Sequence, residues 1–126
     1  MKYVMNKHGK IVLFLSLISL VLIPAYTFAD ALDPLICPTN VNKTACPHNR
    51  EGIDHYKEGH WDVAAKHFSE AVKSDPKFAE AHYNLALCYE QMDKHREATE
   101  HFKMAAKLAP KNDKIQKSEI LLKHIQ

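Results

Sequence analysis

A period of 34 residues is the feature of this sequence that most restricts its fold. Pro76 and Pro110 are 34 residues apart, and the same shift superposes several other identical residues. Chance would rarely place so many identities in one register, so the chain contains an internal repeat. The other matched pairs are His48 with His82, Ala64 with Ala98, His67 with His101, Phe68 with Phe102, Ala71 with Ala105, Lys73 with Lys107 and Lys77 with Lys111.

Each repeat unit has the pattern of two helices. In the second unit, apolar residues recur at steps of three, four and seven, which predicts one apolar stripe per helix. The break between the helices falls at Asp93, a residue type that tolerates the left-handed conformation of helix ends. Gly59 holds the equivalent place in the first unit and adopts that conformation without steric cost. Each unit is therefore predicted to be a helical hairpin.

These units resemble the tetratricopeptide repeat, whose pattern is Trp-x2-Leu-Gly-x2-Tyr, then Ala-x3-Phe, then Pro. In the second unit His82 replaces tryptophan, and Leu85, Ala86, Tyr89, Ala98, Phe102 and Pro110 stand at the pattern's spacings, with Ala86 in the small-residue position of glycine. The first unit keeps Gly52, Ala64, Phe68, Ala71 and Pro76 but has Glu51 in place of leucine and His55 in place of tyrosine. A terminal repeat is expected to depart in this way.

The resemblance covers about residues 48–126 and implies an all-α fold, a TPR-type α-solenoid of two antiparallel helical hairpins plus a solvating helix. We expect the repeats at about residues 45–78 and 79–112. Asn112 or Asp113 can cap a last helix at about 113–126, with its apolar side formed by Ile115, Leu122 and Ile125.

The N-terminus has the layout of a secretory signal peptide, residues 1–29. Basic residues precede an apolar stretch from Ile11 to Ile23, which Pro24 and small residues follow. Cleavage is expected after Ala29, with Ala31 as the alternative. A membrane span needs roughly 20 apolar residues, so an uncleaved membrane anchor is a poorer interpretation than a cleaved signal peptide. Such an anchor is the only membrane contact that we expect. The chain is predicted to be exported, to a periplasm or to the cell exterior.

Charge argues against nucleic-acid binding. The whole chain carries a formal net charge of +2, and loss of the leader removes Lys2, Lys7 and Lys10 but no acid, which leaves −1. The mature chain therefore has no excess of positive charge to attract phosphates.

Residues 30–47 form a proline-interrupted arm in which Cys37 and Cys46 are the natural disulfide pair for an oxidising compartment. Free or intermolecular thiols are the alternative. Cys88 falls on a small-residue packing position, which predicts a buried thiol. Asn42-Lys43-Thr44 is a glycosylation acceptor pattern, and its use depends on a source that the sequence does not identify.

The resemblance also implies a concave groove, lined by the first helix of each hairpin, that binds a peptide. Tyrosine and leucine at these positions can instead pack on the arm or on the last helix, and this alternative stays open. Asn84 and Lys114 match the carboxylate clamp of some family members, but Asn49, Ile53 and Ser118 do not. The groove candidates are Asn49, Ile53, Tyr56, Tyr83, Leu87, Glu90, Lys114, Lys117 and Leu121.

No metal, cofactor or catalytic residue is predicted. No two histidines lie three or four apart on one helix, and HExxH and CxxCH motifs are missing from the sequence. The sequence also lacks a glycine-rich phosphate loop and a plausible nucleophile set, so we expect a protein that is not an enzyme.

Two functions remain open. The first is an exported adaptor or scaffold, a monomer with an open concave face that binds a protein or peptide segment. The second is a structural subunit that self-associates by head-to-tail stacking into oligomers or filaments. A redox accessory role for Cys37 and Cys46 is disfavoured, because their spacing is too wide for CxxC chemistry.

Overall fold

The computed structural model describes residues 4–5, 11–12 and 32–126. β1 (Val4–Met5) and β2 (Ile11–Val12) pair antiparallel, with Val4 opposite Val12 and Met5 opposite Ile11. Both expected cleavage points and the rest of the apolar run lie outside the described residues. Among the described helices, none has the length and apolarity that crossing a membrane requires.

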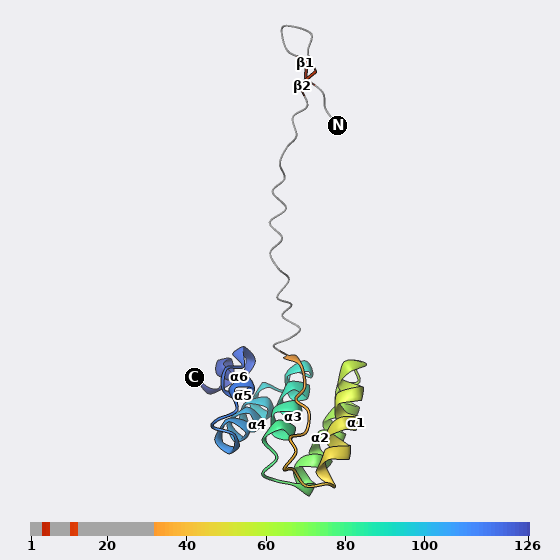
Figure 1. Ribbon diagram of the computed structural model, residues 1–126, viewed down its shortest axis with the longest axis vertical. Coiled ribbons are helices and arrows are strands. Elements are labelled where there is room, and N and C mark those ends of the chain that lie inside the picture. Colours follow the sequence, from red (N-terminus) through yellow and green to blue (C-terminus); the bar gives the residue numbers. More distant parts are fainter. Residues whose placement is uncertain (1–3, 6–10, 13–31) are drawn as a thin grey trace.

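Four helices form the two predicted hairpins, α1 (Ala45–Lys57) with α2 (Trp61–Ser74) and α3 (Ala79–Gln91) with α4 (His95–Leu108). Figure 1 shows them stacked side by side along the chain. Gly59 and Asp93 have positive φ angles of 79° and 56°, so the predicted left-handed turns are confirmed. Pro47 lies in the first turn of α1, where a missing N–H costs no helical hydrogen bond, so the helix begins before the predicted end of the arm.

The core between the helices is built from the two matched phenylalanines and small residues. Phe68 and Phe102 are fully buried, one in each hairpin. Alanines opposite them let the helix axes approach, which is why the repeat pattern needs small side chains at these positions. The fully buried alanines at the predicted packing positions are Ala64, Ala71, Ala86, Ala98 and Ala105.

The segment after Pro110 forms two short helices where one was expected, α5 (Asp113–Gln116) and α6 (Glu119–Ile125). The Asn112 side chain caps α5 by accepting hydrogen bonds from two backbone N–H groups. Ser118 caps α6 in the same way, accepting from the N–H of Leu121. A serine that caps a new helix ends the preceding one, so the closing segment turns and buries Ile115 and Leu121 against the second hairpin.

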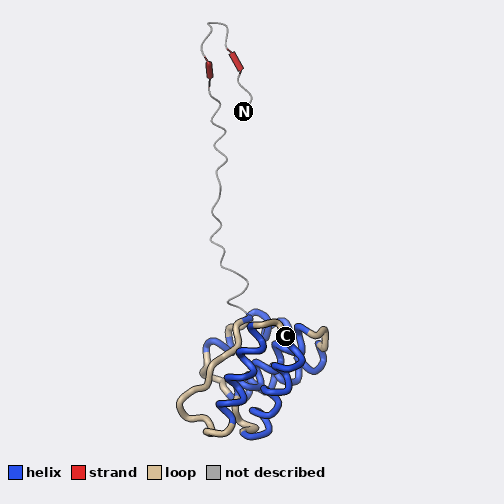
Figure 2. Tube along the Cα trace, turned by 90° about the vertical axis from the view of Figure 1, so that its right-hand side faces the viewer, coloured by secondary structure: helices blue, strands red, loops and turns tan. Residues whose placement is uncertain are grey.

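The arm, residues 32–44, is an irregular segment that runs beside α1 and α3 (Figures 1 and 2). Leu32 and Leu35 pack against the main core. Further along, Cys37 and Val41 pack against a smaller cluster that includes Phe78 and Ala81. The arm is therefore part of the folded domain.

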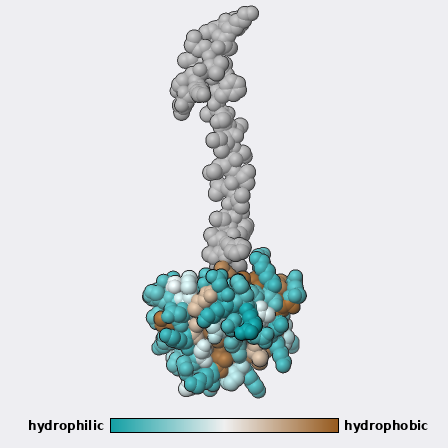
Figure 3. Space-filling model, turned by 180° about the vertical axis from the view of Figure 1, so that it is seen from behind, coloured by the Kyte–Doolittle hydropathy of each residue, from teal (hydrophilic) through white to brown (hydrophobic). Residues whose placement is uncertain are grey.

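The side of the molecule opposite the arm has few exposed hydrophobic residues. Figure 3 shows a mainly hydrophilic surface on which hydrophobic residues form small, separate patches. The candidate functional site lies on the side of the arm.

Candidate functional site

The candidate site is the concave face formed by α1 and α3, and its central residues are two asparagines. Asn49 lies on α1 and Asn84 on α3, and both side chains are buried. Asn84 Nδ2 donates to Asn49 Oδ1 at 2.9 Å, which joins the first helices of the two hairpins across the floor of the groove.

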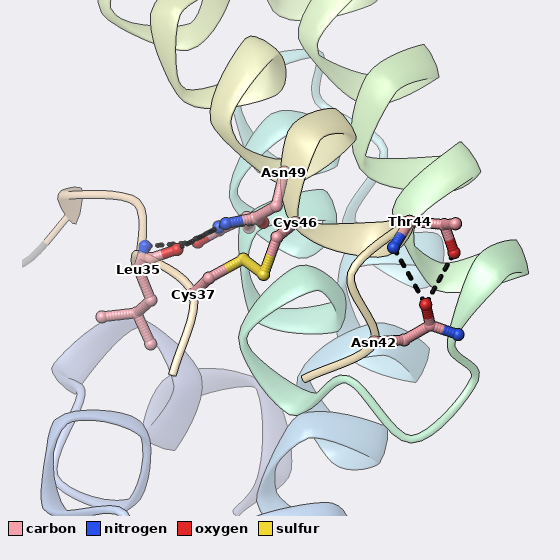
Figure 4. The surroundings of a disulfide bond; sticks show 7 residues. Leu35, Cys37, Asn42, Thr44, Cys46 and Asn49 are labelled. Atoms are coloured by element: carbon pink, nitrogen blue, oxygen red, sulfur yellow. Dashed lines mark hydrogen bonds between the residues drawn. A yellow bond between two sulfur atoms is a disulfide. The ribbon is translucent and has the colours of Figure 1, made fainter. Parts of the chain in front are cut away.

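The two asparagines hold the main chain of Leu35 in the arm, and Figure 4 shows Asn49 beside Leu35. Asn84 Oδ1 accepts from the N–H of Leu35 at 2.6 Å, while Asn84 Nδ2 donates to the carbonyl oxygen of Leu35 at 2.8 Å. Asn49 Nδ2 donates to the same oxygen at 3.0 Å. Both backbone groups of one residue are therefore satisfied by the groove, and the Leu35 side chain packs on the core in addition.

Side chains of the arm alternate between the groove and solvent. Leu32 and Leu35 pack into the core cluster, whereas the side chain of Ile36 is 75% exposed. Pro34 and Pro38 restrict the segment to extended backbone, because proline fixes its own φ and disfavours the helical region for the residue before it. Residues 32–38 thus lie in the groove as a bound peptide would.

A disulfide between Cys37 and Cys46 links the arm to the first turn of α1 (Figure 4). Their Cα atoms are 5.8 Å apart. Between them, Asn42 Oδ1 accepts from the backbone N–H and the hydroxyl of Thr44, at 2.9 and 2.7 Å, which closes a small turn. The disulfide therefore anchors the arm at the C-terminal end of its groove-bound segment.

Two clefts flank the arm. One, of about 550 Å³, lies between the arm and α1 and includes Ile36, Arg50 and Ile53 in its lining. The other, of about 500 Å³, lies between the arm and the closing helices, where Lys114 and Lys117 line it together with acidic residues. The arm thus divides the concave face, and the open groove expected for an adaptor is filled.

The predicted groove residues fall into three groups: those that line the clefts beside the arm, one that lies beyond the groove, and those buried in the core. Asn49 and Ile53 contact the arm or its cleft, and Lys114 and Lys117 line the second cleft. Glu90 contacts histidines beyond the groove. The remaining candidates are buried in the core, namely Tyr56, Tyr83, Leu87 and Leu121.

The two buried tyrosines pack within the fold, Tyr83 towards the closing segment and Tyr56 on Trp61 of its own hairpin. Tyr83 Oη lies 2.8 Å from Ser118 Oγ, and burial raises the pKa of Tyr83. Tyr56 packs edge-on against Trp61 at a ring-centre distance of 4.8 Å. These side chains support the groove floor, and replacing them would test stability before it tested binding.

From the sequence, Asn84 was considered only as a carboxylate-clamp or packing residue. No role was predicted for Leu35. The signal for Asn84 was its position on the concave side of the second repeat. No signal pointed to Leu35, since main-chain recognition requires no particular residue type.

Cys88 is a free thiol buried in α3, as predicted, and burial raises its pKa to about 12. It lies in the core, where its small side chain fits the packing position between the helices. Its role is therefore structural.

Comparison with known proteins agrees with this geometry. A tetratricopeptide repeat family model matches residues 49–113, just over half of the chain and the part that runs from α1 into α5. Such repeats are typically non-catalytic and generally mediate protein interactions, and no enzyme family was identified. Neither the curated proteins nor the solved structures gave a match. On the family match and the two helical hairpins, the chain belongs to the tetratricopeptide repeat family.

Proposed function

We propose that this protein is an exported adaptor that binds an extended segment of another envelope or secreted protein in its concave groove. The observation that carries the proposal is the arm itself. Asn49 and Asn84 hold both backbone groups of Leu35, which gives the groove the hydrogen-bonding pattern needed for an extended peptide. Main-chain bonds supply affinity and side-chain pockets supply specificity in this mode of recognition.

The side chains of the arm define the partner's chemistry. A segment that replaces it needs an aliphatic residue at the position of Leu35 and a second one at the position of Leu32, which pack on the core. It tolerates proline, as the arm does at Pro34. The mixed charges of the flanking cleft, with Lys114 and Lys117 beside acidic residues, favour no single charge on the partner.

Exchange of the arm for a partner requires only residues 32–36 to leave. Cys37 stays tethered to Cys46, so the rest of the arm keeps its place. A tethered segment competes at an effective concentration on the order of millimolar. The arm is therefore expected to weaken binding of any partner and to cover the apolar floor of the groove when no partner is present.

Export is supported by the leader and by the cysteines. Residues 1–29 have the signal-peptide layout, and disulfides such as Cys37–Cys46 persist outside the reducing cytosol. In a compartment where the disulfide is stable, the disulfide also keeps the arm anchored to α1.

A peptide titration tests the groove. A fluorescent peptide with the sequence of residues 31–37, Cys37 replaced by serine, is added to the unaltered protein and to a variant whose residues 32–36 are glycine and serine. The variant is expected to bind the peptide with a micromolar Kd, and the unaltered protein at least tenfold more weakly, because its own arm competes.

Asn84→Ala in the arm-replaced background is expected to weaken binding at least tenfold, because two bonds to the peptide backbone are lost. Lys103→Ala, an exposed change on α4, is the control. Circular dichroism verifies that both variants fold. Binding that is absent in the arm-replaced protein, or that is unchanged by Asn84→Ala, would rule out the groove.

Light scattering distinguishes the adaptor from a self-assembling subunit. The disulfide keeps the arm close to the groove of its own copy, so we expect a monomer at every concentration in the absence of reductant. Growth into oligomers with concentration would favour head-to-tail assembly instead.

A further inference from the structure

Three side chains from three helices converge at the end of the second hairpin. Glu90 is in the last turn of α3, His95 begins α4, and His124 is in α6. Glu90 Oε2 lies 2.9 Å from His95 Nδ1 and 2.9 Å from His124 Nε2. One nitrogen from each histidine and one carboxylate oxygen all lie within 4.8 Å of one another.

Thr99 fixes the tautomer of His124. The Thr99 hydroxyl donates its single hydrogen to the carbonyl oxygen of His95 at 2.8 Å. Thr99 Oγ1 is also 2.7 Å from His124 Nδ1, so the hydrogen in that bond must come from the histidine. His124 Nδ1 is therefore the protonated nitrogen, and in a neutral ring Nε2 carries a lone pair.

With this tautomer of His124, two hydrogen-bond acceptors face each other. The lone pair of His124 Nε2 faces the carboxylate of Glu90 at 2.9 Å, in a position where the His124 side chain is only 12% exposed and that of Glu90 21%. Two acceptors at this distance repel unless a positive species lies between or beside them. We propose that the species is a divalent transition-metal ion such as Zn²⁺, bound by Glu90 Oε2, His95 Nδ1 and His124 Nε2.

The ligand set suits this class of ion. Zn²⁺ takes imidazole nitrogen and carboxylate oxygen at about 2.0–2.2 Å in a tetrahedral arrangement, which separates neighbouring ligand atoms by about 3.3 Å. The two contacts of Glu90 need to widen by only a few tenths of an ångström, and the two histidine nitrogens already lie within 4.8 Å of each other. The hydrogen bond from His124 Nδ1 to Thr99 is the outer-shell contact that typically orients a metal-bound histidine. His95, 62% exposed, leaves a path for the ion and room for a water as fourth ligand.

The same composition occurs twice on the first hairpin, and those clusters serve as comparisons. His48, Glu51 and His67 form one, and His55, Glu58 and His60 form the other. The carboxylates of both are more than half exposed to solvent, unlike that of Glu90. We therefore place the ion at Glu90, where the carboxylate is more buried and the ligands come from three helices.

Binding there would attach α6 to the second hairpin, because each of the three ligands lies on a different helix. The ion would therefore stabilise the closing segment of the array. This role is independent of the groove, since none of the three ligands contacts the arm through a described hydrogen bond.

The test uses the full-length chain, purified as the host processes it and stripped with EDTA. Zinc chloride is titrated calorimetrically, and cobalt chloride is titrated with visible absorption. We expect one site with a Kd in the micromolar range or tighter, the intense absorption of tetrahedral Co²⁺, and a Tm that rises with zinc. His95→Gln, at an exposed position that leaves the fold unchanged, and His124→Gln should each weaken binding at least 50-fold.

His60→Gln removes one histidine from a comparison cluster and should leave this Kd unchanged. Thr99→Val keeps the shape of the side chain and should weaken zinc tenfold or more through the orientation of His124. Zinc binding that survives both His95→Gln and His124→Gln, or that is lost only in His60→Gln, would overturn the proposal. So would a protein that binds no zinc.

Discussion

Gly52 is the position where the packing of the first hairpin can be tested most sharply. It lies on α1 against the fully buried ring of Phe68. A Cβ added at Gly52 would meet Phe68 Cε1 at 2.6 Å, Cδ1 at 2.7 Å and Cζ at 3.0 Å. The ring must move if alanine replaces this glycine, and the surrounding core gives it little room.

Two effects of opposite sign decide the outcome for Gly52→Ala. Alanine favours the helix by about 1 kcal/mol relative to glycine. Overpacking a core costs about 1–3 kcal/mol, and a clash with an aromatic ring belongs at the upper end of that range. We expect the free energy of unfolding to fall by about 1–2 kcal/mol, which lowers the Tm of a domain this size by roughly 5–10 °C.

The second hairpin supplies the matched control, because Ala86 occupies the equivalent position on α3 and is fully buried beside the matched Phe102. Ala86→Gly should also destabilise, by about 2 kcal/mol, through lost helix preference and a lost methyl group. Phe68→Leu in the Gly52→Ala background should recover part of the loss, measured by urea denaturation of the single and double variants. A Gly52→Ala protein more stable than the unaltered one would refute the argument.

Three further predictions concern titratable and sulfur groups. Burial lowers the pKa of both His82 and His101, so the unfolded chain binds more protons below about pH 6.5. Urea midpoints should therefore fall from that pH towards pH 5, and a midpoint that rises over this range would contradict the assignment. Replacing Cys37 and Cys46 together with serine should cost about 2–3 kcal/mol and speed amide exchange throughout the arm, and unchanged exchange would show that the disulfide does not anchor it. Cys88, with its pKa raised to about 12, should react with thiol reagents at pH 8 only as fast as the protein unfolds, which a comparison of labelling and unfolding rates measures.

The repeat architecture could be predicted from sequence because its determinants are local and periodic. Phe68 and Phe102, 34 residues apart, fixed the register, and the turn residues Gly59 and Asp93 followed from the conformations that they tolerate. Such signals depend on spacing along one or two helices. They are the kind of information that a single sequence contains.

The position of the arm could not be predicted in the same way. Leu35 is held mainly through its backbone, and hydrogen bonds to backbone leave no trace in residue type. The division of the closing segment depends on Ser118, whose preference for capping competes with helix continuation and is decided by packing.

The histidine cluster escaped sequence analysis for a geometric reason. A sequence reveals histidines three or four residues apart on one helix, whereas Glu90, His95 and His124 come from three helices. Glu90 was predicted to line the groove because of its position in the repeat pattern of α3. Which neighbour its side chain would meet depended on how α6 folds back, and that contact is tertiary.

The central claim is that the groove holds the arm as a replaceable ligand, and the side-chain amides of Asn49 and Asn84 report on it directly. In nitrogen-15 NMR spectra we predict that both amide resonances shift when residues 32–36 are replaced by glycine and serine. Addition of the arm peptide should return both towards their original positions, because it restores their bonds to a backbone carbonyl. Resonances that ignore the replacement, or that do not respond to the peptide, would contradict the claim.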